Sequence, residues 1–425
     1  MRRSAWTYCR ERLDLNINRE HLQLEAANTA YCTLRDLDPA RAELVELRHH
    51  IHQNPEIGHA EFETARLVAE KLTGWGYEVT EGVGGTGVVG TLKSGSGKRS
   101  VGVRADMDAL PIVEQTGLAY ASRNEGLMHA CGHDGHTTML LGAAKELAAT
   151  RNFSGTVHLI FQPAEEAGID CGAKRMLADG LFERFPCDAV FALHNHPGSP
   201  ARAFRFHAGP FMSASDRVTI VVKGIGGHAA RPHQAVDGIV AASSIVMALQ
   251  TVVARNVDPT KTAVITVGTI QGGKAMNVIA NDVKLGLSVR SFDEDVRVLL
   301  QRRITEVAQS QAASYGATAE VDYQLGHPVL VNSEDETELA REVAAELVGA
   351  GNVLEIDRIT GSEDFAYMLK QVPGCLLRIG NGVGDKVPLL HTSRYDFNDE
   401  NLTVGAAFWV RLVQRFLDRK VAAHA

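Results

Sequence analysis

Residues 155–168 read GTVHLIFQPAEEAG, an apolar segment that leads through Pro163 into two adjacent carboxylates, Glu165 and Glu166. A short apolar run that ends at a proline predicts a β-strand buried on both faces, as in a parallel sheet. Polar residues that follow such a strand lie at the carboxyl edge of the sheet, where α/β folds bind their ligands. This segment therefore indicates both the fold class and the location of a site, although the carboxylate pair alone is also compatible with a solvated acidic loop.

The rest of the chain alternates helical and apolar strand patterns around this segment. Further strands are predicted at 87–92, 100–108, 187–197 and 374–382, and helices at 40–56, 63–76 and about 136–149. Gly74 and Gly76 provide the stop signals of the second helix. Segments 338–351, 363–372 and 400–417 continue the same pattern after an interruption. The expected fold is an α/β domain with a mostly parallel sheet.

The interruption has its own order of elements. Strands are predicted at 215–224, 262–270, 282–291 and 317–326, and helices at 237–254 and 296–316. The order βαββαβ is typical of a ferredoxin-like α+β module. We therefore expect an extension at residues 1–38, a catalytic domain formed by 39–212 and 326–425, and an inserted domain at 213–325.

Composition limits the class of protein. A chain of 425 residues is expected to form two domains, and its formal net charge of −8 argues against nucleic acid as the main partner. The six cysteines are too few and too scattered for a disulfide framework, which favours a reducing cytoplasm. The apolar stretch 238–254 contains polar residues and favours a buried helix over a membrane span. The N-terminus resembles no secretory signal, so residues 1–38 are interpreted as a genuine tail or an over-long start.

A second segment, MHACGHDGHTTMLLGAA at 128–144, has the composition of a metal site. Cys131, His133 and His136 lie in a predicted loop with a helix behind them, and thiolate and imidazole groups at this spacing can reach one ion. The alternative is a buried thiol beside polar residues that cap the helix.

Other strand ends carry the same residue types. His194 and His196 end the strand at 187–197, His391 follows the strand at 374–382, and Asp106 and Asp108 end the strand at 100–108. Together with the carboxylate pair and the cysteine cluster, these residues predict a metal centre at the carboxyl edge of the sheet.

One motif points elsewhere. Gly82, Gly84 and Gly87 match the dinucleotide-binding pattern G-x-G-x-x-G, and Asp106 follows at about the expected distance. The residues after Gly87 predict a strand, however, rather than the helix that would hold a pyrophosphate. We interpret these glycines as a tight β-turn.

The motifs as a set resemble a known family. From about residue 40 to 420 and in collinear order, the chain is similar to the aminoacylase and hippurate-hydrolase group of dinuclear metallopeptidases, which includes the plant-type indole-acetyl-amino-acid hydrolases. The motifs that carry the resemblance are RADMDALP, HACGHDGH, FQPAEE, ALHNHP, GGHAARPH, GGKAMNVI, GSEDFA and LHTSRYDFND.

The resemblance implies roles for individual residues. The implied metal ligands of two divalent ions (zinc, manganese or cobalt) are Cys131, His133, Glu166, His194 and His391. Cys131 would bridge the ions, and Glu165 would be the general base. The residues alone do not decide which of the two adjacent glutamates binds metal and which takes the proton. Asp108 is expected to orient a ligand, whereas His136 and His196 remain unassigned; position 196 is more often aromatic or apolar in the group.

Residues of the inserted domain have implied roles as well. His228, on a glycine-rich turn, would stabilise an oxyanion in the active site of a neighbouring subunit. Asn277 and Arg290 would contact substrate, and an arginine suits a carboxylate through two hydrogen bonds. A homodimer or higher homo-oligomer formed through this lid or dimerisation domain is therefore expected. The alternatives are a solvated His228, an Arg290 that pairs within the module, and a monomer whose edge strand is protected by charge.

The predicted function is metal-dependent hydrolysis of the amide bond of N-acyl amino acids, with small-molecule substrates and neither nucleic acid nor membrane as a partner. A dipeptidase or carboxypeptidase that uses the same site is the alternative. A metal-binding protein without activity would not need Glu165, and a nicotinamide-dependent oxidoreductase would need the glycine motif set aside above.

Overall fold

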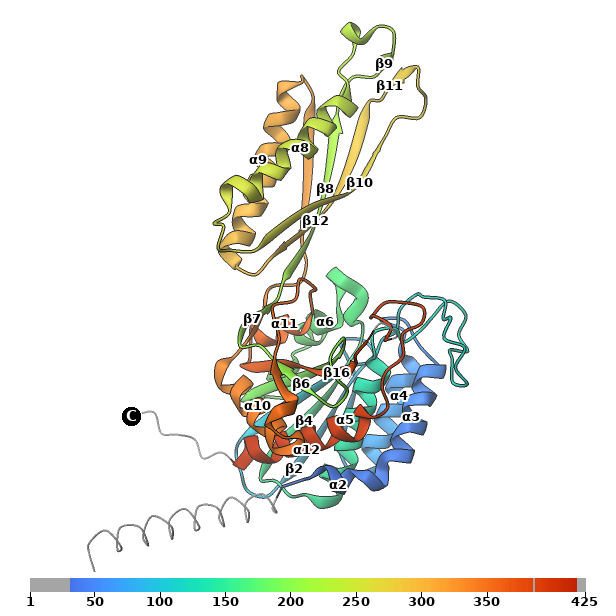
Figure 1. Cartoon of the computed structure of the whole chain (residues 1–425), viewed down its shortest axis with the longest axis vertical. Helices are drawn as coiled ribbons and strands as arrows, with labels where there is room; N and C mark the ends of the chain where they lie inside the picture. The colour runs from blue at the N-terminus through green and yellow to red at the C-terminus, as the bar shows by residue number, and fades with distance from the viewer. Residues whose placement is uncertain (1–30, 385–386, 419–425) are drawn as a thin grey trace, which may run out of the picture.

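An eight-stranded sheet forms the lower part of the molecule in the computed structural model, which describes residues 31–384 and 387–418 (Figure 1). Its four central strands β4, β3, β5 and β16 are parallel, and strands on both flanks add antiparallel pairs. In sheet order the strands are β1 (Glu78–Val83), β2 (Gly87–Ser94), β4 (Gly155–Gln162), β3 (Ser100–Asp106), β5 (Ala189–Pro197), β16 (Gly374–Gly382), β6 (Phe204–Phe206) and β15 (Val353–Glu355).

Helices cover both faces of this sheet, as its continuous apolar strands predict. In β4, Leu159 and Phe161 pack with one layer of helices, whereas Ile160 packs with the other. The larger layer contains α2 (Leu34–Leu37), α3 (Arg41–Gln53), α4 (Phe62–Gly74), α5 (His133–Thr150), α10 (Glu334–Val348) and α12 (Asn401–Asp418). The smaller layer contains α6 (Gly172–Ala178), α7 (Leu181–Arg184) and α11 (Phe365–Leu369).

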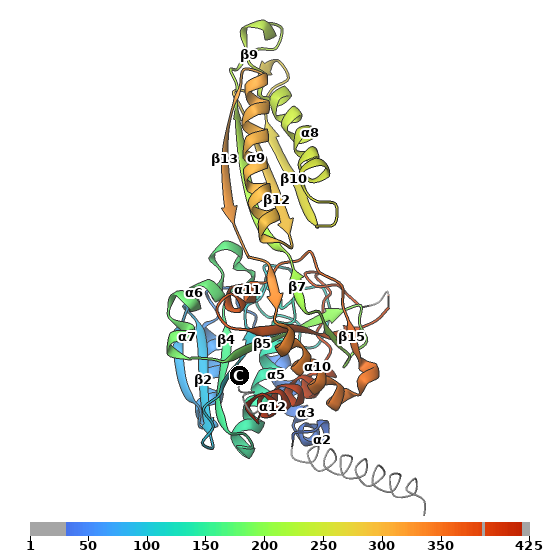
Figure 2. The same ribbon diagram turned by 90° about the vertical axis from the view of Figure 1, so that its left-hand side faces the viewer.

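The inserted domain stands apart from the sheet and its helices (Figures 1 and 2). Its four-stranded antiparallel sheet has the order β10-β12-β8-β13, as in a ferredoxin-like module, and two helices cover one face. The strands are β8 (Ala214–Lys223), β10 (Ala263–Gly272), β12 (Asp282–Ser291) and β13 (Thr318–Leu325), and the helices are α8 (Gly238–Asn256) and α9 (Glu294–Ser314). A small two-stranded antiparallel sheet, β9 (Gly227–His228) with β11 (Val278–Ile279), lies at the outer tip.

Two short strands join the domains. β7 (Gly209–Met212) leads into the insertion, β14 (Leu330–Asn332) leads out of it, and the two pair antiparallel to each other. Helix α8 is long and apolar enough to cross a membrane, but it buries Ala242, Ile245 and Leu249 in the core of the inserted domain.

Three details refine the sequence interpretation. The glycine-rich turn is confirmed, because β1 and β2 form an antiparallel pair around it. Helix α5 was predicted to begin near residue 136 but begins at His133; Asp134 lies in its first turn, where a carboxylate is favourable, and contacts His52 at 2.8 Å. Most of the predicted extension lies outside the described residues. Within its last part, Cys32 and Leu37 are buried in the main core.

Candidate metal centre

The parallel strands end at a cavity between the two domains. Its volume is about 820 Å³, and it is lined by Cys131, Glu165 and His194 from the large domain and by Leu287 and Arg290 from the inserted domain. Residues far apart in sequence meet here because the carboxyl ends of adjacent parallel strands share one edge of the sheet.

The start of helix α5 brings the cysteine and histidine cluster to this edge. Cys131 precedes the helix, and Gly132 turns the chain into it with a φ of 91°. A Cβ atom on Gly132 would lie 2.3 Å from Asn195 Nδ2, so this approach of backbone to side chain requires glycine. His133 and His136 consequently lie on the first turn of the helix.

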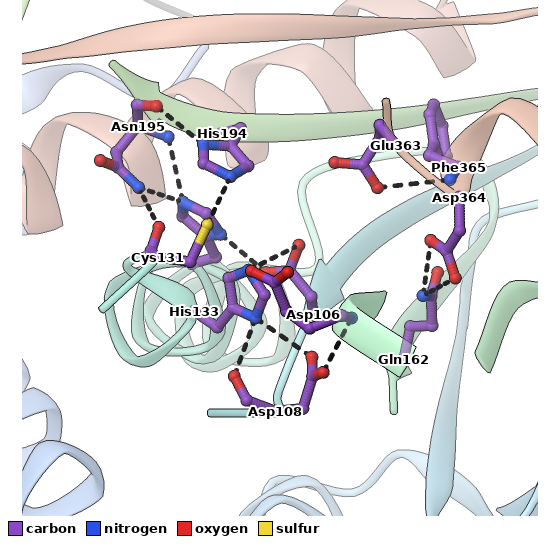
Figure 3. Close-up of polar contacts among 12 residues, drawn as sticks. Asp106, Asp108, Cys131, His133, Gln162, His194, Asn195, Glu363, Asp364 and Phe365 are labelled. Carbon is purple, nitrogen blue, oxygen red and sulfur yellow. Dashed lines mark hydrogen bonds and ion pairs between the residues drawn. The ribbon is translucent and has the colours of Figure 1, made fainter. Parts of the chain in front are cut away.

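Five donor groups converge beside the helix start, and Figure 3 shows three of them, Cys131, His133 and His194. The donor atoms of Cys131, His133 and His194 lie within 4.8 Å of one another, and so do those of Cys131, Glu166 and His391. Cys131 Sγ lies 3.3 Å from His194 Nε2. His391 Nε2 lies 2.9 Å from Glu166 Oε1. Both groups include the Cys131 sulfur, so the arrangement suits two ions that share one thiolate. Thiolate, imidazole and carboxylate are the donors that zinc and related divalent ions use in proteins.

The imidazole of His133 is oriented from behind by Asp108. Its Nδ1 lies 2.8 Å from the Asp108 carbonyl oxygen and 3.1 Å from Asp108 Oδ1, whereas its buried Nε2 has no hydrogen-bond partner. A proton on Nδ1 leaves the lone pair of Nε2 free, which is the form that binds metal. Asp108 Oδ2 also accepts the backbone N–H of Glu166 at 3.0 Å. Asp108 thus connects two of the donor residues.

The donor groups favour a cation electrostatically. Burial raises the pKa of the Cys131 thiol, and the carboxylate of Glu166 raises it further. Hydrogen bonds to Cys131 and Glu166 raise the pKa of His391 to about 10. Without a metal these two groups hold protons near neutral pH, and a divalent cation would replace those protons. The residues present therefore fit a divalent metal ion.

Glu165 lies on the same side of the cavity, in a cluster of acidic groups. Its side chain is buried, and its oxygen atoms lie within 4.8 Å of those of Glu363 and Asp364. Burial raises the pKa of Glu165 well above the ordinary range, and the carboxylates of Glu363 and Glu166 raise it further. A buried carboxylate with a raised pKa beside metal-donor groups is a candidate for proton transfer.

Sequence reasoning assigned no role to Arg104, which holds this acidic cluster together. Its guanidinium donates to Asp106 at 2.7 Å and to Glu363 and Asp364 at 3.0 Å each. The available signal was a charged residue inside the apolar strand SVGVRAD, because a buried charge needs partners. Glu363 and Asp364 come from the quoted motif GSEDFA and line the same network.

Glu61 is a second positioning residue that the sequence did not indicate. The residue before Glu165, Ala164, has a left-handed backbone with a φ of 50°, and its N–H donates to Glu61 Oε1 at 2.7 Å. The other carboxylate oxygen of Glu61 accepts the Thr86 hydroxyl at 2.5 Å. This buried pair of contacts fixes the turn that directs Glu165 into the cavity; no local sequence signal marks it.

The two unassigned histidines differ in their surroundings. Both ring nitrogens of His136 are engaged: Nδ1 lies 2.7 Å from Asp106 Oδ1, and Nε2 accepts the backbone N–H of Asn195 at 3.0 Å. His136 therefore supports the strand ends rather than offering a free donor. His196 lines the cavity, and burial and the nearby Arg378 lower its pKa to about 4.

The residues predicted in the inserted domain lie in two places. Arg290 lines the cavity, and its Nη1 is buried without a hydrogen-bond partner. His228 and Asn277 lie instead at the outer tip with β9 and β11, at the end of the domain opposite the sheet edge (Figure 1). There the N–H of Ala229 donates to the Asn277 carbonyl at 3.0 Å. Within one chain, the structure does not bring His228 or Asn277 to the donor groups.

Known proteins are similar to this chain in both sequence and fold. Residues 102–415 match the model of peptidase family M20/M25/M40. A hippurate hydrolase from Campylobacter jejuni is 43% identical over 380 residues, which cover 89% of this chain and 97% of that protein. Thermostable carboxypeptidase 2 from Saccharolobus solfataricus is 36% identical over 381 residues, 88% of this chain and 96% of that protein.

A solved structure with a similar fold belongs to the same family as these sequence relatives. A dinuclear metal-binding peptidase of the M20 family from Bacillus subtilis superposes with a TM-score of 0.78 at 31% identity, and the match covers 90% of this chain and all of that chain. Together with the donor groups at the strand ends, these similarities show that the chain belongs to peptidase family M20/M25/M40.

Proposed function

We propose that the protein is a metal-dependent amidohydrolase that cleaves the amide bond of N-acyl amino acids. The observation that carries the proposal is Glu165, a buried carboxylate beside metal-donor groups in a cavity of substrate size. The related hippurate hydrolase supports N-acyl amino acids as the substrate class. The related carboxypeptidase favours a second candidate, hydrolysis of a peptide bond by the same residues.

Two divalent ions would be held by five side chains, Cys131, His133, Glu166, His194 and His391. Zinc, manganese and cobalt all accept such donors, and the thiolate alone does not choose among them. When bound, the ions would act as Lewis acids, which lower the pKa of a bound water toward neutrality and polarise the amide carbonyl. Asp108 keeps His133 in the tautomer that binds metal.

The chain itself moves the protons. Glu165 accepts a proton from the water that attacks the amide carbon and then delivers it to the nitrogen of the leaving amine as the C–N bond breaks. Burial and the carboxylate of Glu363 raise its pKa, which favours the protonated form that donates in the second transfer. The products are a carboxylate and the free amino acid.

Assembly completes the proposal. We infer a homodimer formed by the inserted domain, with His228 and Asn277 of one subunit serving the cavity of the other. Strand β10 is an open edge of its sheet, and beside it α8 exposes the apolar side chains of Val240 and Met247. An open edge next to an exposed apolar helix face is suited to a two-fold contact.

The five cysteines among the described residues are free, which supports a reducing, cytoplasmic location.

The deciding experiment combines metal analysis with a small set of substrates. We expect the purified protein to carry, or to be activated by, up to two divalent ions per chain and to hydrolyse N-benzoyl and N-acetyl amino acids. Dipeptides with a free amine are included as substrates, and their hydrolysis would support the second candidate function. If a chelator leaves activity unchanged and elemental analysis finds no metal, the proposed function is wrong.

A further inference from the structure

Arg378 differs from every other buried arginine in the described part of the chain. Its side chain is 4% exposed, yet it makes no ion pair, and its buried Nε has no hydrogen-bond partner. Its one hydrogen bond runs from Nη2 to the sulfur of Met212 at 2.9 Å. The buried arginines that do have carboxylate partners are Arg48, Arg104, Arg297 and Arg411.

The position of Arg378 is next to the proposed chemistry. It lies on β16 directly beside His194 of β5, and it lines the same cavity as Cys131 and Glu165. Burial lowers the pKa of Arg378, although the carboxylate of Glu363 opposes this. Glu363 is already paired with Arg104 and does not serve as the partner of Arg378. The cavity therefore contains a buried guanidinium whose hydrogen-bonding capacity the protein leaves largely unused.

A buried charge without a partner destabilises a fold. A bound anion that pairs with the Arg378 guanidinium would compensate this cost. A guanidinium prefers a planar anion that accepts two parallel hydrogen bonds, and a carboxylate has that shape. Arg290, on the opposite wall, is a second arginine with an unused nitrogen, but it is only half-buried. Arg217 also lines the cavity but is exposed. Three arginines in one cavity match a substrate that carries a carboxylate near the scissile amide.

We propose that Arg378 is a specificity-determining residue that binds a carboxylate group of the substrate beside the metal-donor residues. This inference rests on the proposed function and deepens it, because it assigns the anionic part of the substrate to a residue of the large domain. The carboxylate belongs either to the amino-acid part or to the acyl part of the substrate, and both have the same chemistry at Arg378.

The test compares Arg378→Met, which preserves length but removes the charge, with Arg378→Lys, which keeps the charge but loses the two-pronged geometry. Arg205→Met is the matched control, because Arg205 lies beside Arg378 on the neighbouring strand β6 but does not line the cavity. Substrates form two pairs in which one carboxylate is replaced by a carboxamide: benzoylglycine with benzoylglycinamide, and succinylglycinamide with succinamoylglycinamide. Melting temperature and metal content show whether each variant is folded and loaded.

We expect Arg378→Met to raise KM about 10- to 100-fold for the carboxylate-bearing member of one pair, as loss of a charged hydrogen bond predicts. The kcat for that substrate and both constants for its neutral partner should change little, and Arg378→Lys should fall between wild type and Arg378→Met. The affected pair identifies the source: benzoylglycine indicates the amino-acid carboxylate, and succinylglycinamide the acyl carboxylate. Equal loss of kcat for all four substrates, or no change for any, would overturn the proposal.

Binding measured by calorimetry separates this inference from the proposed function. If the wild-type protein binds benzoylglycine more tightly than benzoylglycinamide but hydrolyses neither, the proposed function fails. The role of Arg378 is then tested by measuring how tightly Arg378→Lys and Arg378→Met bind the same two compounds. If Arg378→Met does not fold, unchanged carboxylate preference in Arg378→Lys by both kinetics and calorimetry contradicts the proposal.

Discussion

Glu165 and Glu166 are adjacent in sequence but have different surroundings. Glu165 is buried against Glu363 and Asp364, whereas Glu166 is partly exposed, contacts His391 and has its backbone N–H fixed by Asp108. The sequence could not separate the two roles, because the direction of each side chain depends on the turn that Glu61 holds. The geometry supports Glu166 as the ligand and Glu165 as the base, and both assignments stay predictions.

Glu165→Gln is therefore expected to retain fold and metal while losing most turnover. An amide has nearly the same size as a carboxylate but cannot accept the proton, and loss of a general base lowers kcat about 100- to 10,000-fold. The measurements are kcat and metal content per chain, with the exposed Glu125→Gln as control. If Glu166→Gln abolishes turnover with metal retained while Glu165→Gln only loses metal, the two roles are exchanged.

At the scale of elements, periodicity and apolar runs predicted the parts that bury the most surface. The strands at β4, β3, β5 and β16 and the βαββαβ order of the insertion needed only local patterns. The short strands β6, β7, β14 and β15 were not predicted, since three or four residues carry no periodic signal and form only where a neighbouring strand pairs with them.

The predicted ligands, by contrast, could be located from sequence because each lies next to a strand or helix with a clear pattern. His194 and His391 come with the strands β5 and β16, and Cys131 precedes α5. Supporting residues such as Arg104 and Glu61 could not be placed in the same way. Their roles depend on partners hundreds or tens of residues distant, and only the folded chain brings those partners together.

Because two of the donor groups hold protons that a metal ion must displace, metal binding is expected to be coupled to pH. In the metal-free protein the pKa of Cys131 is raised and that of His391 is about 10, so both groups are protonated at pH 7. A divalent ion must displace these protons, so its apparent affinity should rise with pH through the neutral range and fall on acidification. Calorimetric titration of the metal in two buffers with different ionisation enthalpies measures the protons released.

The matched variants for this measurement are Cys131→Ser and Cys187→Ser, since both thiols have raised pKa values but only Cys131 lies among the donor groups. Cys131→Ser should bind metal more weakly and release fewer protons, whereas Cys187→Ser should behave as wild type. Equal proton release by all three proteins would mean that Cys131 is a packed thiol rather than a ligand.

At the scale of the whole molecule, the long inserted domain separates His228 from the donor groups of its own chain (Figure 2). His228 is exposed, and its Nδ1 accepts the N–H of Ala230 at 3.1 Å. Among residues 31–384 and 387–418 of its own chain, no donor group of the metal centre contacts His228. If His228 contributes to catalysis in this arrangement, it must act in a second subunit. The open edge of β10 and the exposed apolar residues of α8 make the inserted domain the expected contact.

Subunit mixing tests this directly. His228→Ala and Glu165→Gln are each expected to be nearly inactive alone, and random exchange should restore about a quarter of wild-type activity, since half of the dimers are mixed and each of these has one intact site. Mixing Glu165→Gln with Cys131→Ala is the control, because both changes affect residues of the large domain, so no intact site forms and no recovery is expected. Exchange is verified by a size tag on one variant. Complete exchange without recovery in the first mixture would assign His228 to its own subunit or to no catalytic role.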